Sequence, residues 1–257
     1  MIKIESLIFN YKTTPIFDNF NWQVQSGDLW TILGPSGCGK STLLSLLAGL
    51  LSPISGTISV NNEALVRPRP QTGLILQDYG LLPWATVGQN ASLGLQLRNF
   101  YGADGVHAPK SLAGVESLDL WLGKLGLTSV VNKYPGQISG GQRQRTAIAR
   151  TLILKPDLLL MDEPFSSLDA PTRESLQSLT MELFKEEQLT VIMVTHSIEE
   201  AVLMGRKILL LNNHPNCIAQ IIENKNAGTN GYRESREYQI SCKYLRNLMN
   251  PIIGQGL

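Results

Sequence analysis

The stretch that decides the fold is Gly34-Pro35-Ser36-Gly37-Cys38-Gly39-Lys40-Ser41. It matches the pattern GxxxxGK[ST], in which glycines allow successive backbone N–H groups to point inward at phosphate oxygens. A helix that begins near Lys40 would direct the positive end of its dipole at the same place. The pattern predicts that Lys40 reaches the β- and γ-phosphates of a nucleotide and that the Ser41 hydroxyl binds Mg²⁺.

The residues around this loop predict a strand before it and a helix after it. Residues 29–33 form a short, mostly apolar segment, and residues 41–51 resemble a buried helix that ends at Ser52-Pro53. Because of this context we interpret the loop as a phosphate site rather than a flexible turn. Cys38 lies inside it, and we interpret this cysteine as a small filler rather than a redox switch.

Strands alternate with helices along most of the chain, which predicts a largely parallel sheet covered by helices on both faces. The predicted strands are residues 2–9, 17–24, 29–33, 56–60, 74–76, 158–161, 190–195 and 207–211. The later predicted helices are residues 139–154, 173–186, 198–204 and 235–249. Between residues 78 and 137 helical patterns replace the apolar strands, around a loose stretch at 102–114. This change predicts a small helical insertion, and the polar residues 223–231 predict a linker.

The composition is that of a folded protein with little charge. Lys and Arg number 22 against 21 Asp and Glu, a net charge of +1, and only 17% of residues are charged. This balance argues against disorder and against a nucleic-acid partner. The longest apolar runs, residues 43–51 and 158–161, are too short to span a membrane. The cysteines Cys38, Cys217 and Cys242 form no CxxC pair, which argues against zinc and fits a reducing compartment.

An acidic pair, Asp162-Glu163, follows the buried strand at residues 158–161. This is the end of a strand at which open α/β sheets bind ligands. We predict that Asp162 holds Mg²⁺, directly or through water. In an extended chain Glu163 would point the opposite way and face the attacking water rather than the metal.

A third motif, Ser139-Gly140-Gly141-Gln142, combines a capping serine, two glycines and a helix start. It predicts a second anion-binding helix N-terminus, and an ordinary helix cap is the alternative. Two phosphate sites so far apart in sequence serve one nucleotide only if they fold together or belong to different subunits.

Together these motifs resemble the ATPases of ABC transporters. Residues 138–145 resemble the family's signature sequence, usually written LSGGQ, with Ile138 in place of the leucine. The glycine-rich loop and the acidic strand end stand in the positions of the family's Walker A and Walker B sequences. The resemblance implies an α/β P-loop NTPase (RecA-like) core with an antiparallel β subdomain and an inserted helical subdomain.

The resemblance covers about residues 1–223 and implies a division of the chain. An ABC ATPase domain would occupy residues 1–222, with its helical subdomain inserted at about 78–137. Residues 223–257 would form a short C-terminal extension with a linker and one helix.

The resemblance also implies roles for single residues. Tyr11 is similar to the family's aromatic residue that stacks on adenine, and Gln77 to its Q-loop glutamine, which binds Mg²⁺ and reports to the membrane partner. Ser167-Leu168-Asp169 resembles the family's D-loop, and His196 resembles the switch histidine. The residues implied to contact the nucleotide are Tyr11, Gly34, Pro35, Ser36, Gly37, Cys38, Gly39, Lys40, Ser41, Thr42, Gln77, Ser139, Gly140, Gly141, Gln142 and Asp169.

Three residues are implied to act in catalysis. They are Glu163, as general base or water-positioning group, and Lys40 and His196, which would stabilise the transferring charge. The implied ligands of Mg²⁺ are Ser41, Gln77 and Asp162.

The family's architecture implies a homodimer that holds ATP between its two copies. Each ATP would contact residues 34–42 of one copy and residues 139–142 of the other, which would account for the two separated phosphate sites. Residues 76–84, together with Thr86, Val87 and Asn90, resemble the subfamily of nitrate, sulfonate and taurine importers, some relatives of which carry thiamine-pyrimidine precursors. We therefore expect membrane permease subunits to dock near residues 77–84, where Leu81, Leu82 and Trp84 would form the docking surface.

The same resemblance implies a peripheral subunit at the cytoplasmic face of the cell (inner) membrane. An extracytoplasmic solute-binding protein would act on it indirectly. Two alternatives are a P-loop phosphotransferase and a non-transport ABC ATPase. The first has no use for residues 138–142, and the interval between residues 42 and 138 is too short for the coiled coils of chromosome-associated members.

Overall fold

The computed structural model describes residues 1–101, 117–212, 215 and 219–253, so the predicted loose stretch at 102–114 lies outside the described residues. The chain forms two compact units. The first unit contains residues 1–68 and 181–257, and the second unit contains residues 69–180. These units group residues that contact one another in space, and their boundaries differ from the predicted division into residues 1–222 and 223–257. That division therefore remains a prediction.

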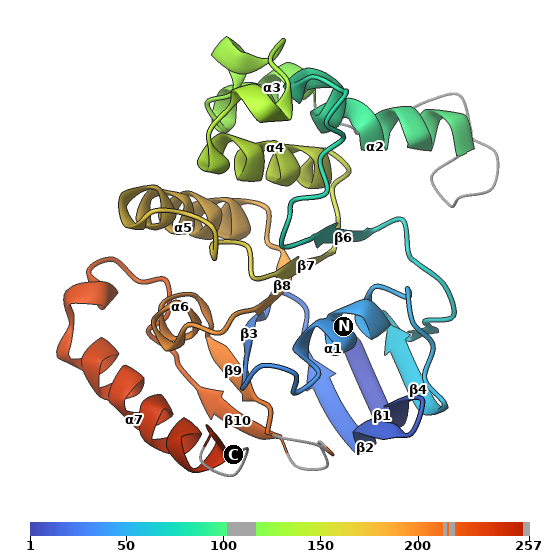
Figure 1. The fold of residues 1–257 in the computed structure, drawn as a ribbon, viewed down its shortest axis with the longest axis vertical. Helices are drawn as coiled ribbons and strands as arrows, with labels where there is room; N and C mark the ends of the chain where they lie inside the picture. The colour runs from blue at the N-terminus through green and yellow to red at the C-terminus, as the bar shows by residue number, and fades with distance from the viewer. Residues whose placement is uncertain (102–116, 213–214, 216–218, 254–257) are drawn as a thin grey trace. The chain divides into compact units, whose positions relative to one another are not determined.

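An antiparallel sheet begins the first unit. Its strands are β1 (Ile2–Tyr11), β2 (Thr14–Val24), β4 (Ser55–Val60) and β5 (Glu63–Ala64), in the order β2-β1-β4-β5 (Figure 1). Buried and exposed side chains alternate at the start of β1, as they do in a strand with one face on the core. β2 begins before the predicted residue 17 because Thr14 and Pro15 already pair with the end of β1. The structure confirms the predicted antiparallel β subdomain.

A parallel group of strands carries the phosphate loop. β3 (Leu29–Leu33) pairs in parallel with β8 (Thr190–Val194) and β9 (Lys207–Leu210), and β10 (Gln220–Glu223) pairs antiparallel with β9. All 5 residues of β3 and all 5 of β8 are buried, as in strands covered on both faces. β10 was not predicted, because so short an edge strand has no clear hydrophobic pattern.

The helix after the phosphate loop, α1 (Lys40–Leu47), is shorter than predicted. Ala48 follows it as C-cap, and Gly49 adopts a left-handed conformation with φ 73°. Such a glycine is a common way to end a helix. The turn therefore comes before Ser52-Pro53, the predicted end.

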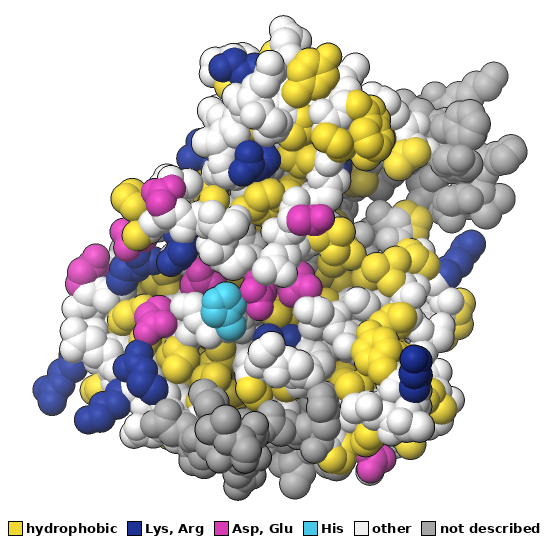
Figure 2. Space-filling model, in the orientation of Figure 1, with side chains coloured by type: hydrophobic (Ala, Val, Ile, Leu, Met, Phe, Trp, Pro, Cys, Tyr) yellow, Lys and Arg dark blue, Asp and Glu magenta, His cyan; other side chains and the backbone are white. Residues whose placement is uncertain are grey.

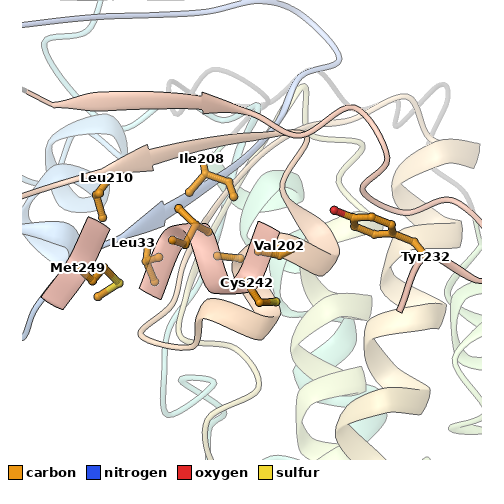
Figure 3. Packing of buried hydrophobic residues seen from close by; sticks show 9 residues of the cluster. Leu33, Val202, Ile208, Leu210, Tyr232, Cys242 and Met249 are labelled. Carbon is orange, nitrogen blue, oxygen red and sulfur yellow. The ribbon is translucent and has the colours of Figure 1, made fainter. Parts of the chain in front are cut away.

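The C-terminal part of the first unit packs as one cluster. α6 (Ile198–Met204) and α7 (Arg236–Ile253) contact each other. The buried side chains of the cluster come from both helices, from β3 and β9, and from Tyr232 (Figure 3). The predicted linker is ordered where it begins: Asn224 is buried, and its amide donates hydrogen bonds to the carbonyls of Val202 at 2.6 Å and Gly205 at 2.9 Å. The hydroxyl of Tyr232, in η3 (Tyr232–Glu234), donates to Asn224 Oδ1 at 2.7 Å. These bonds fasten the start of the predicted linker and η3 to the C-terminal end of α6.

The second unit pairs β6 (Thr72–Ile75) in parallel with β7 (Leu158–Asp162) and adds the helices expected of an insertion. Within the predicted insertion lie α2 (Val87–Tyr101), α3 (Leu118–Lys124) and the short 3-10 helices η1 (Thr128–Val130) and η2 (Pro135–Gln137). α4 (Gly140–Leu152) follows the insertion, where a separate helix was predicted. α2 packs against α3 and α4. α5 (Ala170–Glu186) follows β7 and begins earlier than predicted. The helical subdomain expected from the sequence is confirmed.

Candidate nucleotide-binding site

The phosphate loop folds tightly between β3 and α1. A Cβ on Gly34 would lie 2.7 Å from Cys38 Sγ and 2.7 Å from the carbonyl oxygen of Leu211, so only glycine fits this close approach. Gly39 caps α1 with φ 102°, a conformation that side-chain-bearing residues rarely adopt. The glycines therefore fix the loop at both of its ends.

Lys40 delivers its charge inside this loop. Its side chain is only 7% exposed, and Nζ donates hydrogen bonds to the carbonyl oxygens of Gly34 at 2.9 Å and Pro35 at 2.8 Å. Ser36 and Ser41 are exposed on the same loop. Burial raises the pKa of the Cys38 thiol, which disfavours the reactive thiolate and supports its interpretation as a filler.

His196 emerges at the same edge of the parallel strands as the loop. β3 and β8 run in parallel with Ile32 opposite Val194, and the Thr195 N–H donates to the Ile32 carbonyl at 3.1 Å. The chain leaves both strands at their carboxyl ends, toward Gly34 in one case and His196 in the other. His196 is exposed, and Figure 2 shows a histidine side chain at the surface of the face that it draws.

Tyr11 ends β1 with its side chain 50% exposed, and its ring packs edge-on against Phe9 with centroids 5.0 Å apart. The hairpin that carries it also reaches the phosphate loop. A Cβ on Gly39 would lie 2.6 Å from Ile16 Cγ2, so β2 packs against the start of α1. The first unit thus packs the hairpin that carries Tyr11 against the start of α1 and places His196 at the same strand edge as the loop.

The acidic pair of the second unit lies at the end of β7. Asp162 is the last residue of the strand, and Glu163 has φ 45°, in the left-handed region. The prediction that Glu163 continues an extended chain is therefore wrong, because the backbone turns at this residue. Its carbonyl accepts hydrogen bonds from the Ser166 hydroxyl at 3.0 Å and the Ser166 N–H at 3.3 Å, which hold the turn. Such strained backbone is concentrated at functional sites.

Gln77 and Glu163 lie together, as the motif order implied. Gln77 Nε2 donates a hydrogen bond to Glu163 Oε2 at 3.4 Å. Gln77 comes shortly after β6, the parallel neighbour of β7, so the carboxyl ends of two paired strands bring these side chains to one place.

The signature residues form a capping box at the start of α4. The Ser139 hydroxyl accepts a hydrogen bond from the Gln142 N–H at 3.2 Å, and Gln142 Oε1 accepts one from the Ser139 N–H at 3.0 Å. A Cβ on Gly140 would lie 3.1 Å from Leu168 Cδ2, and one on Gly141 would lie 2.6 Å from Thr172 Cγ2. The glycines therefore let the signature pack against the segment that follows Glu163, while Ser139 stays exposed.

Asp169 belongs to that segment and is exposed. Its carboxylate accepts a hydrogen bond from the Thr172 N–H at 3.3 Å, which caps α5 and explains why this helix begins before residue 173. Hydrogen bonds from the side chain and backbone of Thr172 lower the pKa of Asp169. The second unit thus gathers Gln77, Glu163, the signature residues and Asp169.

Residues that the sequence did not single out for a role hold the loop after Gln77. Arg150, in α4, donates hydrogen bonds to the carbonyls of Tyr79 at 2.7 Å and Gly80 at 2.6 Å. Asn90 in α2 is fully buried; its Oδ1 accepts from the Leu82 N–H at 2.8 Å, and its Nδ2 donates to the carbonyl of Leu82 at 3.1 Å. Arg150 carried no signal, because its partners are backbone carbonyls far away in sequence.

The predicted ligands of Mg²⁺ are chemically suited to that ion. Ser41, Gln77 and Asp162 offer hydroxyl, amide and carboxylate oxygens, the donors that Mg²⁺ prefers. Within the described part of the chain, no group of three or more His, Cys, Asp or Glu side chains could hold a metal ion. In nucleotide sites Mg²⁺ uses few protein ligands together with substrate phosphates.

No helix among the described residues is long and apolar enough to cross a membrane.

Comparisons with known proteins agree with this geometry. The family described as "ABC transporter" matches residues 17–166. The chain is 39% identical over 213 residues to the aliphatic sulfonates import ATP-binding protein SsuB of Bacillus cereus (strain ZK / E33L), covering 83% of this chain and 80% of that protein. It is 40% identical over 215 residues to the taurine import ATP-binding protein TauB of Escherichia coli O157:H7, covering 84% and 81%.

A solved structure is similar along most of its length. This is the dimeric structure of a post-hydrolysis state of the ATP-binding cassette MJ0796 bound to ADP and Pi, with a TM-score of 0.71 and 28% identity. The match covers 86% of this chain and 98% of that one. The chain therefore belongs to the ABC transporter family, as one of its ATP-hydrolysing subunits.

Proposed function

We propose that two copies of this subunit, bound to a membrane permease, use ATP hydrolysis to drive import of a small sulfonate, with taurine as one candidate. The observation that carries the proposal is the edge of the parallel strands in the first unit, where the loop that holds Lys40 and the segment of His196 emerge side by side. The class of solute is supported by SsuB and TauB, whose names specify aliphatic sulfonates and taurine.

In the proposed reaction a water molecule attacks the γ-phosphate of ATP. Glu163 orients this water and accepts its proton, and Lys40 and His196 stabilise the charge that develops on the transferring group. The hydrogen bond from Gln77 to Glu163 supports this assignment. It holds the Glu163 carboxylate beside Gln77, which itself belongs to the loop proposed to contact the permease. Tyr11 offers a half-exposed ring for adenine.

Mg²⁺ completes the proposed site. Ser41, Gln77 and Asp162 would hold it, and when bound it neutralises charge on the phosphates. The remaining work falls to the chain itself: the loop N–H groups and α1 orient the phosphates, and Lys40 binds them.

We propose that each ATP lies between residues 34–42 of one copy and residues 139–142 of the other. Two observations support this. Ser139 is exposed at the N-terminus of a 13-residue helix, where a phosphate is favoured. The similar cassette MJ0796 was solved as a dimer bound to ADP and Pi.

The permease would dock at residues 76–84. Trp84 is 73% exposed and Leu76 45% exposed, and Leu81 and Leu82 are half-buried beside them in sequence. Exposed apolar side chains on a loop that is fixed from within, here by Asn90, are typical of a binding surface. This docking would place the subunit at the cytoplasmic face of the membrane, with a solute-binding protein acting through the permease.

A cavity of about 280 Å³ in the second unit adds apolar surface to the same region. It is lined by Leu74 of β6, by Leu93 and Leu97 of α2, and by Leu154 after α4. β6 leads directly into Leu76 and Gln77, so a partner helix on this loop would have further apolar contacts within reach.

The test is reconstitution with the permease and solute-binding protein from the same genome. We expect ATP turnover to rise when a sulfonate is supplied, and a deletion strain to lose growth on that sulfonate as sole sulfur source. A deletion strain that grows normally on sulfonates but fails on nitrate or a thiamine precursor would overturn the solute class. If the rate of ATP turnover were the same with and without the permease, the proposed role in import would be overturned.

A further inference from the structure

A hydrogen bond joins the loop after Gln77 to the segment after Glu163. The hydroxyl of Tyr79 and the Ser167 Oγ lie 2.8 Å apart, and either can be the donor. We call this contact the Tyr79 bridge. Its two ends are 88 positions apart in sequence. Tyr79 lies in the loop after Gln77, and Ser167 begins the D-loop-like segment 167–169.

Tyr79 reaches the bridge from a strained backbone conformation. Tyr79 is 4% exposed and has φ 66°, a conformation that is unusual for an aromatic residue. Its N–H donates to the Leu76 carbonyl at 2.9 Å, and its own carbonyl accepts from Arg150 at 2.7 Å. Burial lowers the pKa of Arg150, and the guanidinium is compensated by two partly buried hydrogen bonds to the carbonyls of Tyr79 and Gly80. These contacts aim the Tyr79 side chain at Ser167.

One end of the bridge leads to the proposed docking surface. Tyr79 is followed by Gly80 and then by residues 81–84, whose path is fixed by Asn90. A displacement of residues 81–84 would therefore also move Tyr79, which is buried and hydrogen-bonded to Ser167.

The other end leads to the proposed catalytic group. Ser167 follows Ser166, which makes hydrogen bonds to the Glu163 carbonyl at 3.0 and 3.3 Å. It precedes Leu168, whose side chain meets Gly140 of the signature, and Leu168's carbonyl accepts from Arg173 at 2.7 Å. Ser167 is thus part of a short, fully connected segment between Glu163 and α5.

We propose that Tyr79 is a positioning residue that links the permease-docking loop to the segment that sets Glu163 and the signature. When the permease displaces residues 81–84, the bridge carries that displacement to Ser167 as one hydrogen-bonded unit. This inference rests on the proposed docking of the permease and the proposed role of Glu163. It assigns a function to a residue outside every nucleotide-binding motif.

The experiment compares wild type with Tyr79→Phe, Ser167→Ala and the double variant in the complete transporter in vesicles. Loss of one neutral hydrogen bond predicts that solute-stimulated kcat falls by about three- to tenfold in each single variant, with the KM for ATP unchanged. The double variant is expected to fall no further than either single variant, because both remove the same bond. Ser167→Thr keeps a hydroxyl and should restore most of the stimulation.

Tyr244→Phe is the matched control, because it removes a phenol hydroxyl from a half-exposed position on α7. Stimulation equal to wild type in Tyr79→Phe, or additive losses in the double variant, would overturn the bridge. So would a loss of kcat that follows a loss of folded protein in a thermal melt, since that would make Tyr79 merely structural. Wild type that shows no stimulation by the permease would instead contradict the proposed function and can be told apart from these results.

Discussion

The phosphate loop of the first unit and the linked loops of the second unit are held in different ways. Around the phosphate loop the support is backbone and core: β3 is fully buried, Gly34 and Gly39 fit closely, and Lys40 is bound by loop carbonyls. Around Glu163 the support is a chain of side-chain hydrogen bonds from Gln77, Tyr79 and Arg150. The first arrangement suits a rigid binding site, and the second suits loops that shift together.

This difference assigns separate tasks to the two regions. A phosphate cradle gains from being preorganised, because its donors then cost no reorganisation when the nucleotide binds. A set of loops that responds to a partner needs alternative positions of similar energy. The predictions below test whether the first region governs binding and the second governs turnover.

The largest effect is expected from Glu163→Gln. The change removes the proposed base but keeps the shape and the contact with Gln77, so ATP binding should persist while turnover falls by about 10²–10³-fold or more. Nucleotide binding by fluorescence and single-turnover hydrolysis measure the two quantities. Wild-type turnover in this variant would remove Glu163 from the mechanism.

Ser139→Arg should come next. A bulky cation at this exposed helix start would block the ATP of the opposite copy, so hydrolysis should fall by about 10²-fold, the size of effect that removing one site donor has. ATP binding to the single subunit should stay at the wild-type level. Ser139→Ala is the control, since it removes the cap at a cost of about 1 kcal/mol without the steric block. Normal hydrolysis by Ser139→Arg would contradict the shared site.

Arg150→Ala tests the side-chain support of the second region. It leaves the carbonyls of Tyr79 and Gly80 without their donor, which should lower the free energy of unfolding by about 2–4 kcal/mol in denaturant titrations. Arg150→Lys keeps the charge but cannot match both bonds, and is expected to lose about half as much. If Arg150→Ala melts like wild type, the loop after Gln77 is supported by other contacts.

The smallest effect concerns Asp28, the residue just before β3. Burial raises the pKa of Asp28, but hydrogen bonds from the Gln25 N–H, Lys207 and Trp30 outweigh it, and the pKa lies below its ordinary value of 3.8. The stabilisation from Asp28 is therefore complete above that ordinary value and is lost as pH falls through the lower value in the folded protein. Asp28→Asn should lower stability by up to about 1 kcal/mol at pH 7, with the difference shrinking below pH 3.8. A difference that is independent of pH would exclude the ion pair with Lys207 as its source.

The sequence was sufficient for the parts of the site that depend on local pattern. The phosphate loop, the strand that ends at Asp162 and the cap at Ser139 lie where predicted, because strand, glycine and capping signals are short-range. The predicted extended conformation of Glu163 was wrong, because its positive φ depends on contacts such as the hydrogen bond from the Ser166 hydroxyl to the Glu163 carbonyl. Arg150 and the Tyr79 bridge could not be predicted, because both depend on pairs of residues 70 to 88 positions apart.

The central claim is that the phosphate loop of one copy works with the signature of the other. The most direct measurement mixes two inactive variants, Lys40→Ala and Ser139→Arg, and follows ATP turnover. A mixed dimer has one site with both defects and one site with none, so a 1:1 mixture should recover about a quarter of wild-type turnover, given random pairing across a two-fold interface. A mixture no more active than the two variants measured separately would contradict the account.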